Sequence, residues 1–150
     1  AVGEQFEAIR AEILRQPRDP AVLRDEVLAM RQRMLEQHAS RSEEFFDIKH
    51  DRGGLIDVEF IVQYLVLGHA HQHAELCGNL GNIALLAIAA DLGLIDGALA
   101  IPVRDAYRHF RHQQHVLRLN AGRRARVERA GEQSRIDAVR SLWQAVFGTS

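Results

Sequence analysis

The sequence predicts an all-α fold, a bundle of about six helices around a central apolar helix at about residues 54–70. Three observations support this fold class. Apolar residues recur at three- and four-residue spacings along most of the chain. The longest apolar run follows Gly53 and Gly54 and is more than twice as long as a typical strand of about 5–6 residues. Proline and glycine interrupt these patterns, which marks the ends of helices.

Composition sets limits on the class of protein. The chain has 150 residues, of which 47% are hydrophobic and 26% charged, so residues 1–150 can form a single soluble domain with a sizeable core. The formal charge of −1 argues against general binding to nucleic acid or to an anionic membrane. Cys77 is the only cysteine, which excludes a disulfide framework and suits a reducing cytoplasm. We find no signal peptide and no apolar run long enough to span a membrane.

Two helices are predicted before a polar link at residues 39–47, which has an aromatic anchor at Phe45 and Phe46. The first covers about residues 3–16, and its apolar face supplies one stripe of the bundle through Phe6, Ile9, Ile13 and Leu14. Asp19 and Pro20 begin the second helix as N-cap and first helical residue. Its core positions are Leu23, Val27, Met30 and Met34. The solvated face then carries Arg31, Arg33 and Glu36.

Three more helices are predicted after the central one. Asn79 opens a helix rich in small residues, and Gly93 ends it. Asp96 caps the next helix, which we expect to bend or restart at Pro102. The apolar stripe of that helix contains Val103, Tyr107, Phe110, Gln114 and Leu117. The closing amphipathic helix carries Ile136, Val139, Leu142, Trp143, Val146 and Phe147.

Two groups of polar residues could mark binding sites, but each also has a structural explanation. His69, His71 and His73 alternate, yet a helix points successive residues about 100° apart, so we expect a polar helix end with no metal. Between Arg104 and Arg129 the sequence has eight arginines and two acids, a local charge of +6. This basic stretch is either a solvated helix face with an arginine-rich loop or a binding patch.

The most specific pattern lies in residues 47–67. Lys49 precedes the glycine pair, and Asp57 and Glu59 lie at the start of the apolar run, where a purely structural core would usually have apolar residues. With Gly54 as N-cap, Asp57 is the third helical residue, where backbone N–H groups and the helix dipole favour a carboxylate. Glu59 lies on another face, so the two acids do not form a metal-binding pair.

Two arrangements of this motif are physically sensible. In the first, Asp57 occupies the anion-binding start of the helix and Lys49 neutralises it, which makes an internal clasp. In the second, Lys49 and the glycine turn face outward toward a phosphate or an acidic partner, and Asp57 and Glu59 orient the turn. We favour the clasp, because a buried carboxylate needs a partner and Lys49 is the nearest candidate.

The motif closely resembles the helical domain of bacterial glutamine synthetase adenylyltransferase. The matching pattern is Lys49-x-x-x-Gly53-Gly54-x-x-Asp57-x-Glu59-Phe60-x-x-Gln63-Tyr64-Leu65. Further matches follow in order at Pro17-Arg18, Glu26-Val27, Met30-Arg31, Asn82, Gly93, Ala106-Tyr107, Arg111, His115 and Trp143-Gln144. The resemblance covers nearly the whole chain. It departs at Ala84, where the family tends to have a basic residue, and at Gln113-Gln114, where it tends to have an acid. An ion pair between those two family positions would be absent here, which weakens any role for Arg111.

The resemblance implies a parent nucleotidyltransferase that adds AMP from ATP to glutamine synthetase and removes it, with Mg²⁺, in nitrogen regulation in the cytoplasm. The family's catalytic pattern contains an Asp-x-Asp pair that holds the metal ions. This chain has no Asp-x-Asp. We therefore expect a fragment from the C-terminal end of the parent, inactive alone, with no catalytic residue, metal or cofactor of its own.

The resemblance also implies partners: glutamine synthetase, the PII signal protein and the upstream catalytic domain of the same chain. We expect no nucleic acid and no membrane among them. Three roles are open at this point. The chain is a helical accessory domain packing on the adenylylating catalytic domain, a regulatory binding module for PII protein or glutamine, or a purely structural linker. The candidate binding residues are Lys49, Gly53, Gly54, Asp57, Glu59 and Arg111.

Overall fold

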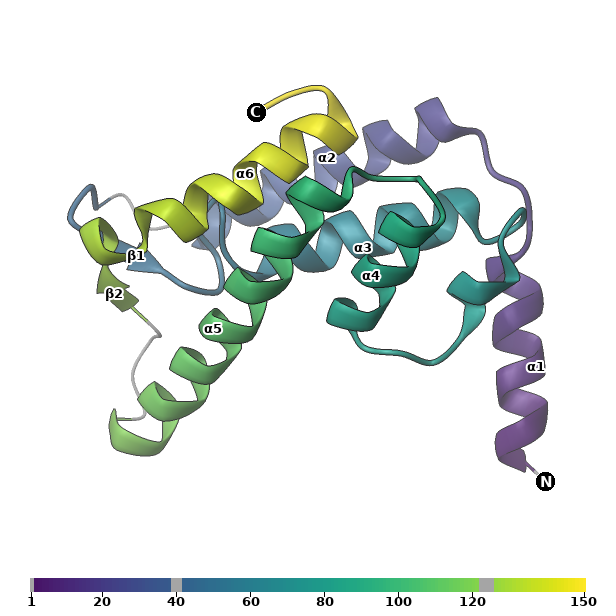
Figure 1. Ribbon diagram of the computed structural model, residues 1–150, viewed down its shortest axis with the longest axis horizontal. Helices are drawn as coiled ribbons and strands as arrows, with labels where there is room; N and C mark the ends of the chain where they lie inside the picture. The colour runs from purple at the N-terminus through teal and green to yellow at the C-terminus, as the bar shows by residue number, and fades with distance from the viewer. Residues whose placement is uncertain (1, 39–41, 122–125) are drawn as a thin grey trace.

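Helix α3, Leu55–His69, lies at the centre of the computed structural model, which describes residues 2–38, 42–121 and 126–150. Figure 1 shows the other helices arranged around it. They are α1 (Val2–Leu14), α2 (Pro20–His38), α4 (Asn82–Asp91), α5 (Gly97–Ala121) and α6 (Gln133–Phe147), with two short 3₁₀ helices, η1 (Ala74–Cys77) and η2 (Arg129–Glu132). The predicted all-α bundle around a central apolar helix is confirmed.

The core lies between α3, α5 and α6. Val58 and Ile61 of α3 and Phe110 of α5 have no exposed surface, and Trp143 and Phe147 of α6 are almost completely buried. The ring of Phe147 packs against that of Trp143, with ring centroids 4.3 Å apart. The apolar stripes predicted for the last two helices therefore face the core.

The helix ends around α4 follow the turn chemistry of the sequence. Helix α4 begins at Asn82, three residues later than predicted, because Gly81 is its extended N-cap. Gly93 takes a positive φ of 77° and Leu94 donates a hydrogen bond to the carbonyl of Ala89 at 2.9 Å, the bond that closes a Schellman motif. The Asp96 carboxylate accepts a hydrogen bond from the amide of Ala98 at 2.9 Å, as expected of a cap.

Helix α5 continues through Pro102 without a break, which corrects the predicted restart. A proline inside a helix removes one backbone hydrogen bond and crowds the preceding turn. Here the helix is packed on both sides of the proline, because Ala100 and Val103 are buried. Packing of the helix outweighs the local penalty.

A two-stranded ribbon was not predicted. Strands β1 (Phe45–Asp47) and β2 (Arg126–Glu128) pair antiparallel, with Phe46 opposite Val127. Strand β1 falls in the predicted polar link and β2 in the basic stretch. Residues 39–41 and 122–125 of those segments lie outside the described residues. Phe46 is fully buried and packs against Phe110, with centroids 5.5 Å apart, so the ribbon brings the expected aromatic anchor into the core.

Most of the predicted apolar face of α1 does not reach the core, contrary to the sequence prediction, and of its four residues Leu14 alone packs against the core. None of its residues is buried, and Phe6, Ile9 and Ile13 are 65%, 57% and 50% exposed. The helix stands at one edge of the bundle (Figure 1). Within residues 2–38, 42–121 and 126–150, no helix is long and apolar enough to cross a membrane.

Candidate functional site

The loop between β1 and α3 carries the motif lysine and is fixed by hydrogen bonds on both sides of it. The Asp47 carboxylate accepts a bond from the amide of Lys49 at 3.0 Å. The carbonyls of Ile48 and Lys49 in turn accept bonds from the amides of Leu55 and Ile56, at 2.8 Å and 3.2 Å. The loop itself therefore satisfies the first two N–H groups of α3. In the outward-facing arrangement of the motif, these N–H groups would have been available to bind an outside anion.

The glycine pair makes the predicted sharp turn and close approach. Gly53 has a φ of +87°, and a Cβ there would lie 2.6 Å from Cγ2 of Ile136 on α6. A Cβ on Gly54 would overlap the carbonyl oxygen of Ile48. Any other residue would push the loop away from α6 or strain its backbone, so both glycines are structural requirements of the loop.

Asp57 is fully buried and has three donors. Arg31 Nε lies 2.5 Å from Oδ1, and Oδ2 accepts bonds from Arg52 Nε at 3.1 Å and from the Gly53 amide at 2.7 Å. The predicted clasp between Asp57 and Lys49 is wrong, because Lys49 is exposed and the two arginines neutralise the carboxylate. Arg31 approaches from α2, a placement that sequence spacing cannot show.

Arg31 was predicted on the solvated face of its helix, and this is also wrong. Its side chain is 2% exposed, and its Nη2 donates a further bond to the carbonyl of His50 at 2.8 Å. The guanidinium of Arg52 lies over the ring of Trp143, 4.8 Å from the ring centroid. The buried triad of Arg31, Asp57 and Arg52 therefore connects α2, the motif loop, α3 and α6.

A second ion pair holds the loop from η2, the short helix that follows the ribbon. Arg129 Nη2 lies 3.4 Å from Oδ2 of Asp51, and the same oxygen accepts a bond from the amide of Asp47 at 2.9 Å. The guanidinium of Arg129 also lies 5.4 Å from the ring centroid of Phe46. Two elements distant in sequence from the loop thus hold it in place.

Lys49 is the only lysine in the sequence, and its side chain is exposed. Among the described residues no carboxylate forms an ion pair with its ammonium group. Its backbone amide and carbonyl are both hydrogen-bonded within the loop. The loop therefore presents an exposed cation on a rigid backbone, an arrangement suited to an anionic partner.

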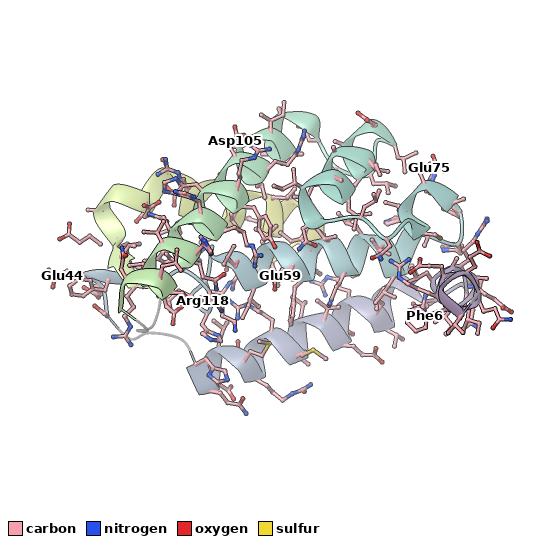
Figure 2. All side chains as sticks on the ribbon, turned by 90° about the horizontal axis from the view of Figure 1, so that it is seen from below. Phe6, Glu44, Glu59, Glu75, Asp105 and Arg118 are labelled. Carbon is pink, nitrogen blue, oxygen red and sulfur yellow. The ribbon has the colours of Figure 1, made fainter. Side chains whose placement is uncertain are left out.

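Glu59 belongs to a separate polar group on the α3, α4 and α5 surface. Tyr107 donates a hydrogen bond to Glu59 Oε1 at 3.4 Å, and its oxygen accepts one from Asn82 at 2.9 Å. Burial raises the pKa of Tyr107, although the hydrogen bond from Asn82 and the charge of Arg111 oppose the shift. Figure 2 shows Glu59 near the middle of the molecule, on α3. Glu59 is partly exposed, and Arg111 is exposed one turn beyond Tyr107.

His69 lies at the end of α3, and most of the described arginines of the basic stretch lie on α5. Within the described residues, no group of three or more His, Cys, Asp and Glu side chains could hold a metal ion. Burial lowers the pKa of His69, and the charges of His73 and His71 lower it further. On α5, Arg108 pairs with Asp105 at 3.2 Å in an exposed position; the segment 122–125 lies outside the described residues.

Comparison with known proteins decides the family. The family described as GlnD PII-uridylyltransferase matches residues 23–136, which include the motif loop and the Glu59 group. The chain belongs to this family. It is 56% identical over 99% of its length to a bifunctional glutamine synthetase adenylyltransferase/adenylyl-removing enzyme of Aromatoleum aromaticum, of which it covers 16%. Proteins with the same name from Bordetella bronchiseptica and Nitrosomonas europaea are 52% and 48% identical over 97% and 98% of the chain.

The chain therefore spans about a sixth of the length of these relatives. The resemblance drawn from the motif is confirmed. Sequence reasoning missed Arg31, Arg52, Arg129 and Trp143 as parts of the site. Arg31 and Trp143 did carry a signal, because Met30-Arg31 and Trp143-Gln144 are both among the positions that match the family pattern.

Proposed function

We propose that the chain is the helical accessory domain of a bifunctional glutamine synthetase adenylyltransferase/adenylyl-removing enzyme, and that it packs on the adenylylating catalytic domain of the same protein. The observation that carries this proposal is the match to proteins of that name, which covers 99% of the chain but 16% of the relative. The chain has no Asp-x-Asp. In this proposal the whole enzyme binds ATP, Mg²⁺ and glutamine synthetase, and it holds the metal outside the described residues. The enzyme would act in the cytoplasm.

Within this function, we propose that the side chain of Lys49 contacts an anionic group, such as a phosphate. This group belongs to the neighbouring catalytic domain or to the nucleotide bound there. Two observations support the assignment. Arg31 and Arg52 already neutralise Asp57, so the lysine has no structural carboxylate to serve there. The hydrogen bonds of the loop fix the backbone of Lys49 while its side chain remains exposed. A fixed backbone reduces the entropy lost when the side chain binds.

The test is the replacement of Lys49 by alanine in a full-length enzyme that contains this chain. We expect AMP transfer to glutamine synthetase to fall roughly tenfold or more, equivalent to about 1.4 kcal/mol, with an unchanged unfolding temperature. Lys49→Arg, which keeps the charge, should retain part of the rate. Arg33→Ala is the matched control, because it removes an exposed cation outside the motif.

The alternative roles give different results in the same experiment. A regulatory module predicts that Lys49→Ala changes only the response to PII protein or glutamine and leaves transfer without these effectors intact. A structural linker predicts that neither transfer nor its regulation changes. A lower unfolding temperature of the Lys49→Ala enzyme would contradict the assignment of Lys49, because it would indicate a structural role.

A further inference from the structure

Helix α1 exposes a continuous apolar stripe, which we call the α1 stripe. Its residues follow each other at spacings of four, three and four, so they share one face of the helix. They are Val2, Phe6, Ile9 and Ile13, which are 84%, 65%, 57% and 50% exposed. With Arg10 and Leu14, the last three line an apolar hollow of about 230 Å³. Figure 2 shows α1 end-on at the edge of the molecule, with Phe6 labelled.

Two arginines and the partly buried Leu14, and not the apolar stripe, hold α1 on the bundle. Arg10 donates hydrogen bonds to the carbonyls of Cys77, at 2.6 Å, and Gly78, at 3.4 Å. Arg18 donates to the carbonyl of Ile13 at the end of α1 and to that of Leu67 in α3, at 3.1 Å and 3.3 Å. A surface helix normally packs through its apolar face. Here two arginines set the position of the helix and leave that face without a partner among the described residues.

We propose that the α1 stripe docks onto a neighbouring domain of the same polypeptide. The relatives that match this chain are about six times its length, so in them most of the polypeptide lies outside the segment described here. Helix α1 also lies outside the family match, which begins at residue 23. The bundle contacts of Arg10, at Cys77 and Gly78, lie within the matched residues, but the stripe itself does not. The inference rests on the proposed function, because it takes the chain to be part of that longer enzyme.

The size of the stripe favours an occupant in the same polypeptide over a second copy or a separate protein. The four side chains expose roughly a few hundred Å². Stable association of separate proteins buries about 800 Å² on each partner. A covalently attached neighbour has a millimolar effective concentration, so a smaller contact is sufficient.

The charges of α1 argue against a lipid surface as the occupant. Its remaining faces carry Glu4, Glu7 and Glu12 against a single arginine, Arg10. Helices that lie on membranes have polar faces rich in lysine and arginine, which anionic lipids attract. An acidic polar face would be repelled. The apolar stripe therefore fits a protein surface.

The test compares the accessibility of two positions on α1 in the full-length enzyme. Ile9→Cys places a thiol in the stripe, and Ala8→Cys places a matched thiol at an exposed position on another face. Iodoacetamide labelling is followed by mass spectrometry of the α1 peptide, so that Cys77 does not interfere. We expect the native Ile9→Cys enzyme to react roughly tenfold or more slowly than Ala8→Cys, and the two to react equally after unfolding in urea.

Equal labelling of the two native enzymes would overturn the inference. Protection of Ile9→Cys that disappears on dilution would also overturn it, because it would identify a second copy as the occupant. A second pair of variants links docking to activity: Phe6→Ser with Ile13→Ser, made in the Ile9→Cys enzyme, should abolish protection of the Ile9→Cys thiol and lower AMP transfer. The control, Ala8→Ser with Glu12→Ser, should change neither.

These results separate the docking from the proposed function. An Ile9→Cys enzyme that transfers AMP normally while its thiol in the stripe is fully accessible refutes the docking alone. An Ile9→Cys enzyme that protects this thiol but, like the wild-type enzyme, transfers no AMP to glutamine synthetase refutes the proposed function alone.

Discussion

Replacing Arg31 by methionine tests the buried triad directly. Breaking a buried ion pair by removing one partner typically costs about 3–5 kcal/mol, because the other charge is left uncompensated. Here Asp57 would keep the Arg52 Nε donor at 3.1 Å and the Gly53 amide at 2.7 Å. Methionine would retain much of the apolar contact of the arginine stem. We therefore expect a loss at the lower end, about 3 kcal/mol of unfolding free energy.

The assay is urea unfolding of the chain followed by the fluorescence of Trp143, which is 1% exposed and reports on the core. The stability difference is read from the shift in midpoint at an unchanged slope. For a domain of this size, a loss of about 3 kcal/mol lowers the unfolding temperature by about 6–12 °C. Lys49→Met is the matched control and should cost less than about 0.5 kcal/mol, as expected for an exposed side chain.

A double-mutant cycle completes the test. Arg31→Met with Asp57→Leu removes both charges, so the pair should be less destabilising than the sum of the single changes by at least about 1 kcal/mol. If Arg31→Met lost no more stability than Lys49→Met, the triad would not hold the loop and our reasoning about Asp57 would be refuted.

Two further predictions concern the same loop. Gly53→Ala should destabilise the chain by about 2–4 kcal/mol in the same unfolding assay, because the residue has a positive φ and the added Cβ would meet Ile136. Gly97→Ala is the control: Gly97 has open space around it, so its replacement should change the unfolding free energy by less than about 0.5 kcal/mol. Burial lowers the pKa of His50, despite the opposing charge of Asp47. The unfolded state then binds more protons below about pH 6.5, so stability should fall as the pH falls through that value, and His50→Gln should reduce the slope of unfolding free energy against pH.

Local sequence patterns were sufficient to predict the helices. The apolar run after Gly54, the glycine at position 93 and the cap at Asp96 each act within one turn of the chain, and each prediction agrees with the structure. The ribbon could not be predicted in this way, because its strands have three residues each and their partners lie about 80 positions apart. Strands this short have no periodicity to detect.

The candidate site was predicted less completely, and for a physical reason. The sequence indicated that Asp57 would be buried and need a cation, but the nearest cation along the chain, Lys49, is not the nearest in space. Arg31 lies 26 positions from Asp57 and becomes its partner only when α2 packs on α3. The unpaired apolar face of α1 is a similar case, because periodicity identifies a face but does not show what covers it.

The position of α6 has a consequence for how the chain folds during synthesis. Trp143 and Phe147, which fill the centre of the core, belong to the last helix, and the carbonyl of Phe147 accepts a hydrogen bond of 2.7 Å from Arg24 in α2. Domains emerge from the ribosome N-terminal end first, at about 5–20 residues per second. The apolar surfaces of α3 and α5 must therefore wait for α6 before they are covered. A nascent chain arrested before α6 should be kept soluble by chaperones, and its cooperative core should form only when α6 is released.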